Sequence, residues 1–411
     1  MVLGGTFFIE ILALPPPIKK IKGWVFRTET ELSQTVARQT YPLDGGNAAL
    51  APALRVQFEI PPGVVVPQTP EVRCWDTDTG SWTSDGIEET EWQPAKRAIR
   101  VHTTRLGALA IVQDRACDLA YSSWKLTPIY DPDPLSEGVE GIDDSEGIFE
   151  DFGQVPEAEL EVETPRFVVR VRIRGTKCRL LGPDLPELRE LLDAPGMGPG
   201  RLIMELERAG IYLSPRDEDA ERATFVRKEG STEGYDEDGG EEREQAAATE
   251  VILKDRTLEE ILCREVASAA AAFEMKSSRW NGGVGNGRAV FEVRETGAFT
   301  GGEGDFIDFK TALVELDEVS DSLRNAPDVG VAPCPVKCAL INGGDEGNVP
   351  PGGDAGLDTT RIPGEDTHAY LLKCLSVSSS PEAVTRARES CCRFRKAVEQ
   401  LLRITRPLSF S

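Results

Sequence analysis

Short apolar segments separated by turn residues fill the first 128 residues, and they limit this part of the chain to a β structure. The segments are TFFIEILAL, GWVFR, LRVQFEIP, EVRCWD, AIRVHTT, ALAIVQD and YSSWKLTPI, with turn signals such as PPP, DGG and SDG between them. In one segment, Leu54, Val56, Phe58 and Ile60 alternate with polar residues, which is the period of a half-buried strand. The pattern predicts an antiparallel β-sandwich domain over residues 1–128.

Two acidic stretches interrupt the chain after this domain. Residues 129–164 contain thirteen Asp or Glu and no Lys or Arg. We interpret them as an acidic linker, or as a strap that orders only on a partner. Residues 216–254 are again acidic, with Gly, Ser and little apolar content, and are predicted to be a disordered insertion.

Between these stretches, residues 165–215 predict a small α+β segment. PRFVVRVRIRG alternates arginines with Val169, Val171 and Ile173, which predicts a strand with one apolar and one basic face. TKCRLL is expected to return as its hairpin partner. Two helices are predicted to follow, PELRELLD and GRLIMELERAG, the second ended by Gly210.

Residues 255–411 predict a helix-sheet-helix α+β domain. The first helix is expected over residues 255–279, with apolar steps of three and four residues that reach Phe273. Strand candidates follow in GRAVFEVRE, DFIDFKTALVEL, PVKCALIN and HAYLLKCLSV. A last helix begins with Ser380 as N-cap and Pro381 at its first position. The predicted fold class is therefore multidomain α+β: a β-sandwich followed by smaller α+β units, the last a sheet packed with two helices.

The overall charge argues against nucleic acid and anionic lipid as partners. The formal net charge is -24 at pH 7, and such a chain repels nucleic acid and anionic lipid. No run of eighteen apolar residues is present, so no helix is expected to span a membrane. Together with the charge, this means that neither a nucleic acid nor a membrane is an expected partner. The nine cysteines are an odd number in a long chain and are interpreted as reduced thiols.

Catalytic motifs are not evident. The two histidines, His102 and His368, lie in strand-like segments and are interpreted as structural. No GxSxG motif occurs, and a nucleophile needs a base beside it. The chain is predicted not to be an enzyme. A hydrolase or thiol enzyme remains an alternative that would require Cys334, Cys338 or His368 to converge.

Metal and phosphate motifs also fit poorly. Cys334 and Cys338 form one loose CxxxC pair, and Cys391 and Cys392 are adjacent, whereas zinc sites show two close pairs. GGVGNG at 282–287 follows a helix and precedes a strand, the reverse of a phosphate loop. DTDTG at 76–80 is interpreted as a hairpin turn rather than a calcium loop. No cofactor and no metal is expected.

Aromatic and basic side chains are the remaining candidates for function. Five tryptophans (Trp24, Trp75, Trp82, Trp92 and Trp124) fall in the predicted first domain, where core packing is the first interpretation and a partner anchor the alternative. The last helix is rich in arginine and lysine. It is interpreted as a solvated or internally paired face, with contact to an acidic surface as the alternative. The candidate partner contacts are Trp24, Trp75, Trp82, Arg388, Arg395, Lys396 and Arg403.

Several segments together resemble a known family. FFIEILALPPPIKKIKGWVFR, CWDTDTGSWTSDGI, HTTRLGALAIVQDRACDLAYSSWKLTPI and CRLLGPDLPELRELLDAPGMGPGRLIMELERAGIYLSP resemble the C-terminal part of the axonemal dynein intermediate chain 7 family, also called the cancer susceptibility candidate 1 family. The resemblance runs over most of the chain outside the acidic stretches. None of these segments is a catalytic motif.

The resemblance implies a ciliary or flagellar protein associated with an inner dynein arm. It implies contact with dynein heavy and intermediate chains and with tubulin, and a role in arm assembly and motility. It implies no catalytic residue. Family members also carry a long, charged, helical N-terminal region, which is expected to have no counterpart in this sequence. The alternative function is a general cytosolic adaptor or a dynein-arm assembly factor without an axonemal role.

Overall fold

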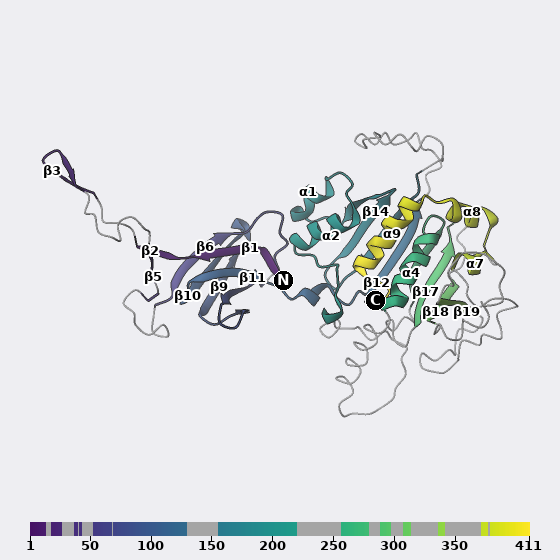
Figure 1. Cartoon of the computed structure of the whole chain (residues 1–411), viewed down its shortest axis with the longest axis horizontal. Coiled ribbons are helices and arrows are strands. Elements are labelled where there is room, and N and C mark those ends of the chain that lie inside the picture. Colours follow the sequence, from purple (N-terminus) through teal and green to yellow (C-terminus); the bar gives the residue numbers. More distant parts are fainter. Residues whose placement is uncertain are drawn as a thin grey trace, which may run out of the picture. The chain divides into compact units, whose positions relative to one another are not determined.

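The structure is a computed structural model that describes most of the predicted elements. The described residues are 1–13, 18–26, 37–39, 41–42, 52–67, 69–129, 155–219, 256–278, 288–296, 307–313, 336–341, 371–376 and 379–411. They form two compact units: Met1–Asp114 with Arg208–Gly210, and Arg115–Glu207 with Ile211–Ser411 (Figure 1). We call them unit 1 and unit 2 and describe each by itself.

Unit 1 consists of antiparallel strands. One sheet has the order β1-β11-β7-β8, formed by β1 (Val2–Ile9), β7 (Glu71–Asp76), β8 (Ser81–Thr83) and β11 (Gly107–Val112). A second has the order β6-β10-β9, formed by β6 (Leu54–Glu59), β9 (Ile87–Gln93) and β10 (Ala98–Thr103). Two short pairs complete the unit: β2 (Ile11–Ala13) with β5 (Ala37–Gln39), and β3 (Lys19–Ile21) with β4 (Trp24–Phe26).

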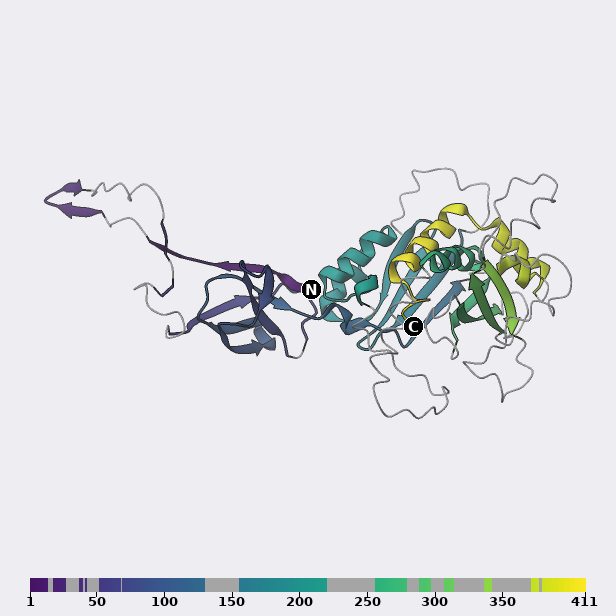
Figure 2. The ribbon, with the colours of Figure 1, turned by 60° about the horizontal axis from the view of Figure 1, so that its bottom comes forward.

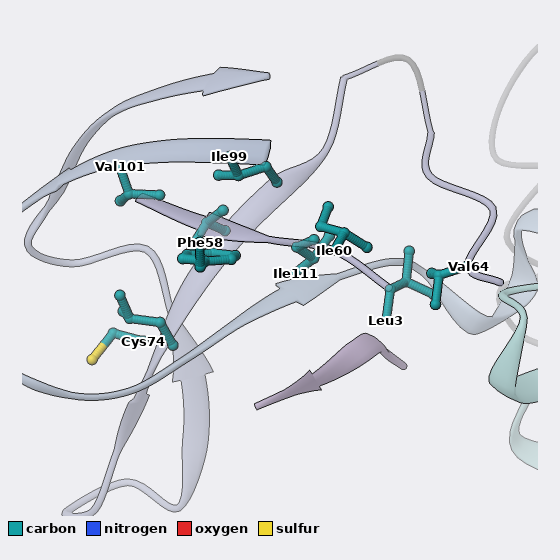
Figure 3. Packing of buried hydrophobic residues seen from close by; sticks show 10 residues of the cluster. Leu3, Phe58, Ile60, Val64, Cys74, Ile99, Val101 and Ile111 are labelled. Atoms are coloured by element: carbon teal, nitrogen blue, oxygen red, sulfur yellow. The ribbon is translucent and has the colours of Figure 1, made fainter. Parts of the chain in front are cut away.

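The core of unit 1 lies between its two larger sheets. The first sheet contributes buried residues such as Leu3 and Ile111, and the second contributes Phe58, Ile99 and others (Figure 3). Phe58 stacks on Phe7 of β1, with ring centroids 4.1 Å apart, which links the two sheets directly. The alternation in LRVQFEIP is confirmed, because Phe58 and Ile60 are buried while the polar residues between them are exposed. The expected β-sandwich is therefore confirmed.

Unit 2 is built on one eight-stranded antiparallel sheet of order β15-β14-β13-β12-β16-β17-β18-β19. Its strands are β12 (Ser123–Ile129), β13 (Glu157–Glu163), β14 (Val168–Arg174), β15 (Lys177–Gly182), β16 (Phe273–Ser277), β17 (Arg288–Glu295), β18 (Ile307–Leu313) and β19 (Val336–Ile341). The α-helices are α1 (Arg189–Leu192), α2 (Pro199–Arg208), α4 (Arg256–Ala269), α7 (Leu371–Leu375), α8 (Pro381–Glu389) and α9 (Cys392–Thr405). Short 3-10 helices cover Arg115–Asp118, Pro186–Leu188 and Asp217–Asp219.

The sheet of unit 2 buries one face. Figures 1 and 2 show α2, α4 and α9 across the same side of the sheet. Alternate residues of β12, β13 and β14 are buried, and Val169, Val171 and Ile173 of β14 are among them, as their spacing predicts. On the other side, glutamates of β13 lie opposite arginines of β14, with Glu157 and Arg174 forming an ion pair of 3.0 Å. The α+β class predicted from the sequence is confirmed.

The structure differs from the expected segments in how the strands combine. The strand Ser123–Ile129, expected at the end of the sandwich, pairs with β13 and β16 in the sheet of unit 2. Residues 157–163, assigned to the acidic linker, form β13, because Ala158, Leu160 and Val162 alternate with glutamates and are buried. Strands expected in two separate α+β pieces therefore join one sheet. Of the predicted insertion at 216–254, the described residues are 216–219.

One predicted strand and two predicted helices also differ. HAYLLKCLSV was predicted to be a strand, but its residues Leu371–Leu375 form the helix α7. The first helix was expected over residues 255–279, but it ends at Ala269, and Phe273–Ser277 form β16. Met275 lies opposite Leu126 of β12 and Val293 of β17, so pairing on both sides of the strand overrides the helix propensity of the alanine run. The last helix is two helices, because Ser390 and Cys391 are extended, with ψ of 139° and 131°. Cys391 and Cys392 therefore lie at the start of α9 rather than inside one helix.

The predicted helix ends agree with the backbone. The Ser380 side chain accepts a hydrogen bond of 3.2 Å from the Ala383 amide, as an N-cap does. At the end of α2, Gly210 has a φ of +92°, and the Ile211 amide donates to the Leu206 carbonyl. A left-handed glycine with this hydrogen bond is a Schellman ending.

One-sided burial predicts that neighbouring residues of β12 differ in their effect on stability. Leu126 is fully buried, and Leu126→Ala is expected to lower the free energy of unfolding by about 2–5 kcal/mol, because it removes apolar contacts and leaves a cavity. Thr127 points to the charged side, and Thr127→Ala is expected to change it by less than about 1 kcal/mol. Urea unfolding followed by circular dichroism measures both, and equal losses would contradict the one-sided core.

Candidate functional site

Trp24 lies on a short hairpin of unit 1. Its strand β4 pairs with β3, and Trp24 lies directly opposite Ile21. The turn residues Lys22 and Gly23 both have positive φ, 49° and 85°, which a two-residue turn of type I′ requires. The Trp24 side chain is 71% exposed. Core packing, the first interpretation of the tryptophans, therefore does not apply to Trp24.

Trp75 and Trp82 form an aromatic pair on a second hairpin. They face each other across β7 and β8, with ring centroids 5.3 Å apart in an edge-on arrangement. The connecting DTDTG segment is a turn, as predicted: the Gly80 amide donates to the Asp76 carbonyl, and the Asp76 carboxylate accepts from the Asp78 amide. Because β8 is an edge strand and Trp75 is 39% exposed, this pair is also accessible.

The other two tryptophans of the predicted first domain are packed inside. Trp92 packs against the sandwich core as a partly buried residue. Trp124 is 1% exposed and belongs to β12 of unit 2, where its ring lies 6.4 Å from that of Phe291. The five tryptophans therefore do not share one domain, and those that the structure exposes are the ones on hairpins.

The basic candidates lie on α8 and α9 of unit 2. Helix α9 turns Phe394, Val398, Leu401 and other apolar residues inward, so its cations face outward. Arg403 is used within the unit, because it pairs with Glu260 of α4 at 2.9 Å and with Glu399 at 3.6 Å.

The three remaining basic candidates are less engaged. Arg388 and Lys396 are exposed, and Arg395 is partly exposed. Within the described residues, none of the three forms an ion pair. They lie on consecutive helices at the C-terminal end of the sequence, so they are the part of the predicted basic face that stays available to a partner.

A hollow of about 520 Å³ lies beside these residues, between α4 and α9. Its charged lining residues are Glu259, Glu260, Glu399, Lys396, Arg403 and Arg406. Three carboxylates and three cations balance one another, so the hollow favours neither an anion nor a cation. It brings together Lys396 and Arg403 of the predicted set.

A buried polar network in unit 2 was not predicted from the sequence. Asp118 is completely buried and accepts hydrogen bonds from Nε and Nη2 of Arg166, at 2.7 and 2.6 Å, and from the Tyr212 amide at 2.8 Å. Its partners are 48 and 94 residues away in the sequence, so no local pattern indicates them.

Asp219 is a second centre of this network. Its carboxylate accepts from Nη2 of Arg115, from the Tyr212 hydroxyl at 2.9 Å and from the Arg216 amide at 2.8 Å. Burial by itself raises the pKa of Asp219, but these donors outweigh burial and hold it below its ordinary value. Burial, followed by the hydrogen bond to Asp219, raises the pKa of Tyr212 to about 12.

Arg406 closes the network at the end of α9. It has a left-handed backbone, with φ of 48°, and it is nearly buried. Its Nε donates to Glu259 at 2.9 Å and its Nη1 to Asp217 at 2.6 Å. Burial raises the pKa of Glu259, and the charge of Arg406 opposes that rise. The buried charges are thus held in pairs that fix chain segments, which indicates a structural role.

Residues of the alternative enzyme hypothesis lie mostly outside the described part. Cys334 and His368 are not described, Cys338 is described only as backbone in β19, and GGVGNG also lies outside. His102 is paired with Glu89 at 3.3 Å on the surface of unit 1.

The buried thiols that the structure describes are protonated. Burial raises the pKa of Cys178 to about 12, and it raises the pKa of Cys263 well above its ordinary value. A protonated thiol is a poor nucleophile. These two cysteines therefore behave as small apolar residues.

Among the described residues, no group of three or more His, Cys, Asp or Glu side chains is arranged to hold a metal ion. No helix formed by those residues is long and apolar enough to cross a bilayer.

The fold and the surfaces define a multidomain α+β protein whose candidate residues lie on exposed hairpins and helices. The chain is similar to proteins named Dynein axonemal intermediate chain 7. The Homo sapiens protein is 24% identical over 303 residues, 71% of this chain and 34% of that protein. The Bos taurus and Mus musculus proteins are each 23% identical over 100% of this chain, and the matches cover 47% and 46% of their lengths.

These comparisons confirm the resemblance inferred from the sequence segments. The chain spans less than half the length of the bovine and mouse relatives that it matches. No family model matches the chain.

The network predicts a large effect of removing its most buried carboxylate. Asp118→Ala removes the carboxylate that pairs with the partly buried Arg166 guanidinium and is expected to destabilise unit 2 by about 3–5 kcal/mol. Arg201→Ala is the control, because Arg201 is 75% exposed and 4.0 Å from Glu205, and it is expected to cost less than about 1 kcal/mol. Denaturant unfolding measures both. A loss for Asp118→Ala as small as the control's would contradict the structural role.

A second prediction concerns pH. Because the pKa of Asp219 is lower in the folded than in the unfolded chain, its contribution is present above the unfolded value of about 3.9 and is lost as pH falls through the folded value. The difference in unfolding free energy between the unaltered chain and Asp219→Asn is expected to stay constant from about pH 7 to about pH 5 and to shrink below about pH 4. Using the difference removes the effect of the other carboxylates. A difference that grows on acidification would reverse the assigned sign.

Proposed function

We propose that this chain is a non-catalytic structural subunit of an axonemal, inner-arm dynein complex. It binds dynein heavy and intermediate chains and tubulin, supports arm assembly and ciliary motility, and resides in the axoneme of a cilium or flagellum, with a cytoplasmic pool. One observation carries the proposal: the similarity to Dynein axonemal intermediate chain 7 of two organisms extends over the full length of the chain.

The chemistry of the described residues supports a non-catalytic role. The most buried carboxylates are engaged by arginines and backbone amides, and the buried thiols are protonated. A general base or a nucleophile needs a free, reactive group within reach of a substrate. The accessible members of the candidate set are tryptophans, arginines and a lysine, and of these tryptophan and arginine are enriched in protein contacts.

Two surfaces supply the proposed contacts. In unit 1 these are the hairpins that carry Trp24 and the Trp75–Trp82 pair. In unit 2 they are the outward cations of α8 and α9, among them Arg388 and Lys396, which suit an acidic surface such as that of tubulin. Arg403 takes a smaller part, because it is already paired with two glutamates.

The proposal predicts stable association with axonemes. The tagged full chain, expressed in a ciliated cell, is expected to remain with demembranated axonemes and to be released by high salt together with inner-arm dynein heavy and intermediate chains. Salt release is expected because contacts between charged surfaces weaken as ionic strength rises. Mass spectrometry of the extract, compared with cells that express the tag alone, is the measurement.

The opposite outcome separates the proposal from its alternative. A chain that stays in the cell body, absent from axonemes and without dynein chains in its complexes, would act as a general cytosolic adaptor. A chain that binds dynein subunits in the cell body but is absent from axonemes would be an assembly factor. Either result would remove the axonemal role.

A further inference from the structure

The hairpin of β3 and β4 concentrates exposed apolar side chains. Five of the nine residues in 18–26 are large, apolar and at least half exposed: Ile18, Ile21, Trp24, Val25 and Phe26. Among the described strands, β3 and β4 pair only with each other. An isolated two-stranded hairpin is marginally stable in water, and a soluble surface seldom carries this density of apolar groups without a use.

The register sorts these residues onto two faces. Residues directly opposite each other in an antiparallel pair share a face, and so do residues two apart in one strand. Ile21 lies opposite Trp24, and Lys19 lies opposite Phe26, so these four share one face. The other face carries the Lys20–Val25 pair. We call the first face, with Ile21, Trp24, Phe26 and Lys19, the aromatic face.

The turn makes this face available without prior rearrangement. Positive φ at both Lys22 and Gly23 gives a two-residue turn whose twist matches that of the strands. The Ile21–Trp24 pair is a β-branched residue against an aromatic one, a combination that stabilises a hairpin. A preformed contact surface loses less conformational entropy on binding than a disordered one.

The charge of the hairpin indicates the kind of partner. Lys19, Lys20 and Lys22 are all exposed, and residues 18–26 contain no acid. The chain as a whole carries a formal charge of -24, so this is a local positive patch on an acidic protein. Apolar anchors surrounded by cations complement an apolar groove bordered by carboxylates.

We propose that the aromatic face of the β3–β4 hairpin is a docking surface for a protein partner within the axonemal complex whose apolar groove is bordered by carboxylates. Trp24, Ile21 and Phe26 enter an apolar groove of that partner, and Lys19 of the same face and Lys22 of the turn pair with carboxylates at its rim. This deepens the proposed function and rests on it, because the partner is taken to be a component of the axoneme.

The charges favour a protein over other occupants. An anionic bilayer would attract the three lysines but repel a chain of net charge -24. A second copy of the chain would bring the same net charge and the same repulsion. A partner that is acidic only around the groove gains the local attraction with less of the general repulsion.

The test compares matched variants of the full chain in binding to demembranated, salt-stripped axonemes to which the desalted high-salt extract, with its dynein chains, has been added back. Trp24→Ala removes the centre of the aromatic face and is expected to weaken binding about tenfold or more, as loss of a buried aromatic anchor does. Val25→Ala is the control, because it alters the neighbouring residue of the same strand on the opposite face and is expected to change binding less than about threefold. Both changes weaken the hairpin itself, so the contrast between them reports the contact.

A charge series gives a second readout. Replacing Lys19, Lys20 and Lys22 together by glutamate is expected to abolish binding, whereas replacing all three by arginine is expected to preserve it. Binding of the unaltered chain is expected to weaken as salt concentration rises, because the lysine pairs at an exposed rim are screened.

The outcomes separate the inference from the proposed function. Failure of the unaltered chain to bind axonemes would overturn both. Binding that is equal for the unaltered chain, Trp24→Ala and the glutamate variant would overturn the docking surface alone. So would a Trp24-dependent binding to phosphatidylserine vesicles in place of axonemes, or a Trp24-dependent dimer in sedimentation velocity, because each would assign the face to another occupant.

Discussion

The eight-stranded sheet of unit 2 can bury only one of its faces, and the rest of that unit follows from this constraint. Along β12, β13 and β14, the side chain of every second residue is buried under the helices. The residues between them face the other way and, apart from Ile129 and Val168, are charged or polar; the glutamates of β13 lie opposite arginines of β14. Cross-strand pairs of opposite charge keep that face compatible with water. The sheet therefore needs no second layer of helices.

The buried polar network depends on the same arrangement. Helices on one side must enter and leave that layer, and the segments that do so carry backbone groups and charges into the interior. Asp219 follows α2 and Arg406 ends α9, and each engages a residue distant in sequence; Asp118 does the same in the turn before β12. Replacing one partner of such a pair leaves a charge without compensation, which costs more than the pair contributes when intact. The network thus stabilises the segments that connect the helices and strands, and it is not a functional site.

Local pattern predicted the elements better than their assembly. The alternation around Phe58 and around Val171 identified strands, and Ser380 and Gly210 identified helix ends, because those signals depend on residues a few positions apart. The eight-stranded sheet was not predicted, because it joins strands that lie on opposite sides of two acidic stretches in the sequence. The residues of β13 were assigned to an acidic linker because of their negative charge. Their alternation of apolar residues and glutamate also predicts a strand. The partners of Asp118 could not be found, because no spacing rule links residues 48 and 94 positions apart.

For the candidate surfaces too, the sequence pattern does not decide which side chains are exposed, and the structure supplies that information. Tryptophan in a β-rich segment predicts a core residue, and for Trp124 this is correct, although its core belongs to the other unit. For Trp24 the exposed fraction decides against it. The charged face of the unit 2 sheet forms ion pairs of its own, among them Arg174 with Glu157 and Lys125 with Glu274, so its charge is partly compensated within the unit. The hairpin lacks any such internal compensation, because carboxylates are absent from its nine residues and its apolar side chains are open to water. Uncompensated apolar area, rather than charge alone, therefore identifies the surface on this chain that a partner would stabilise most.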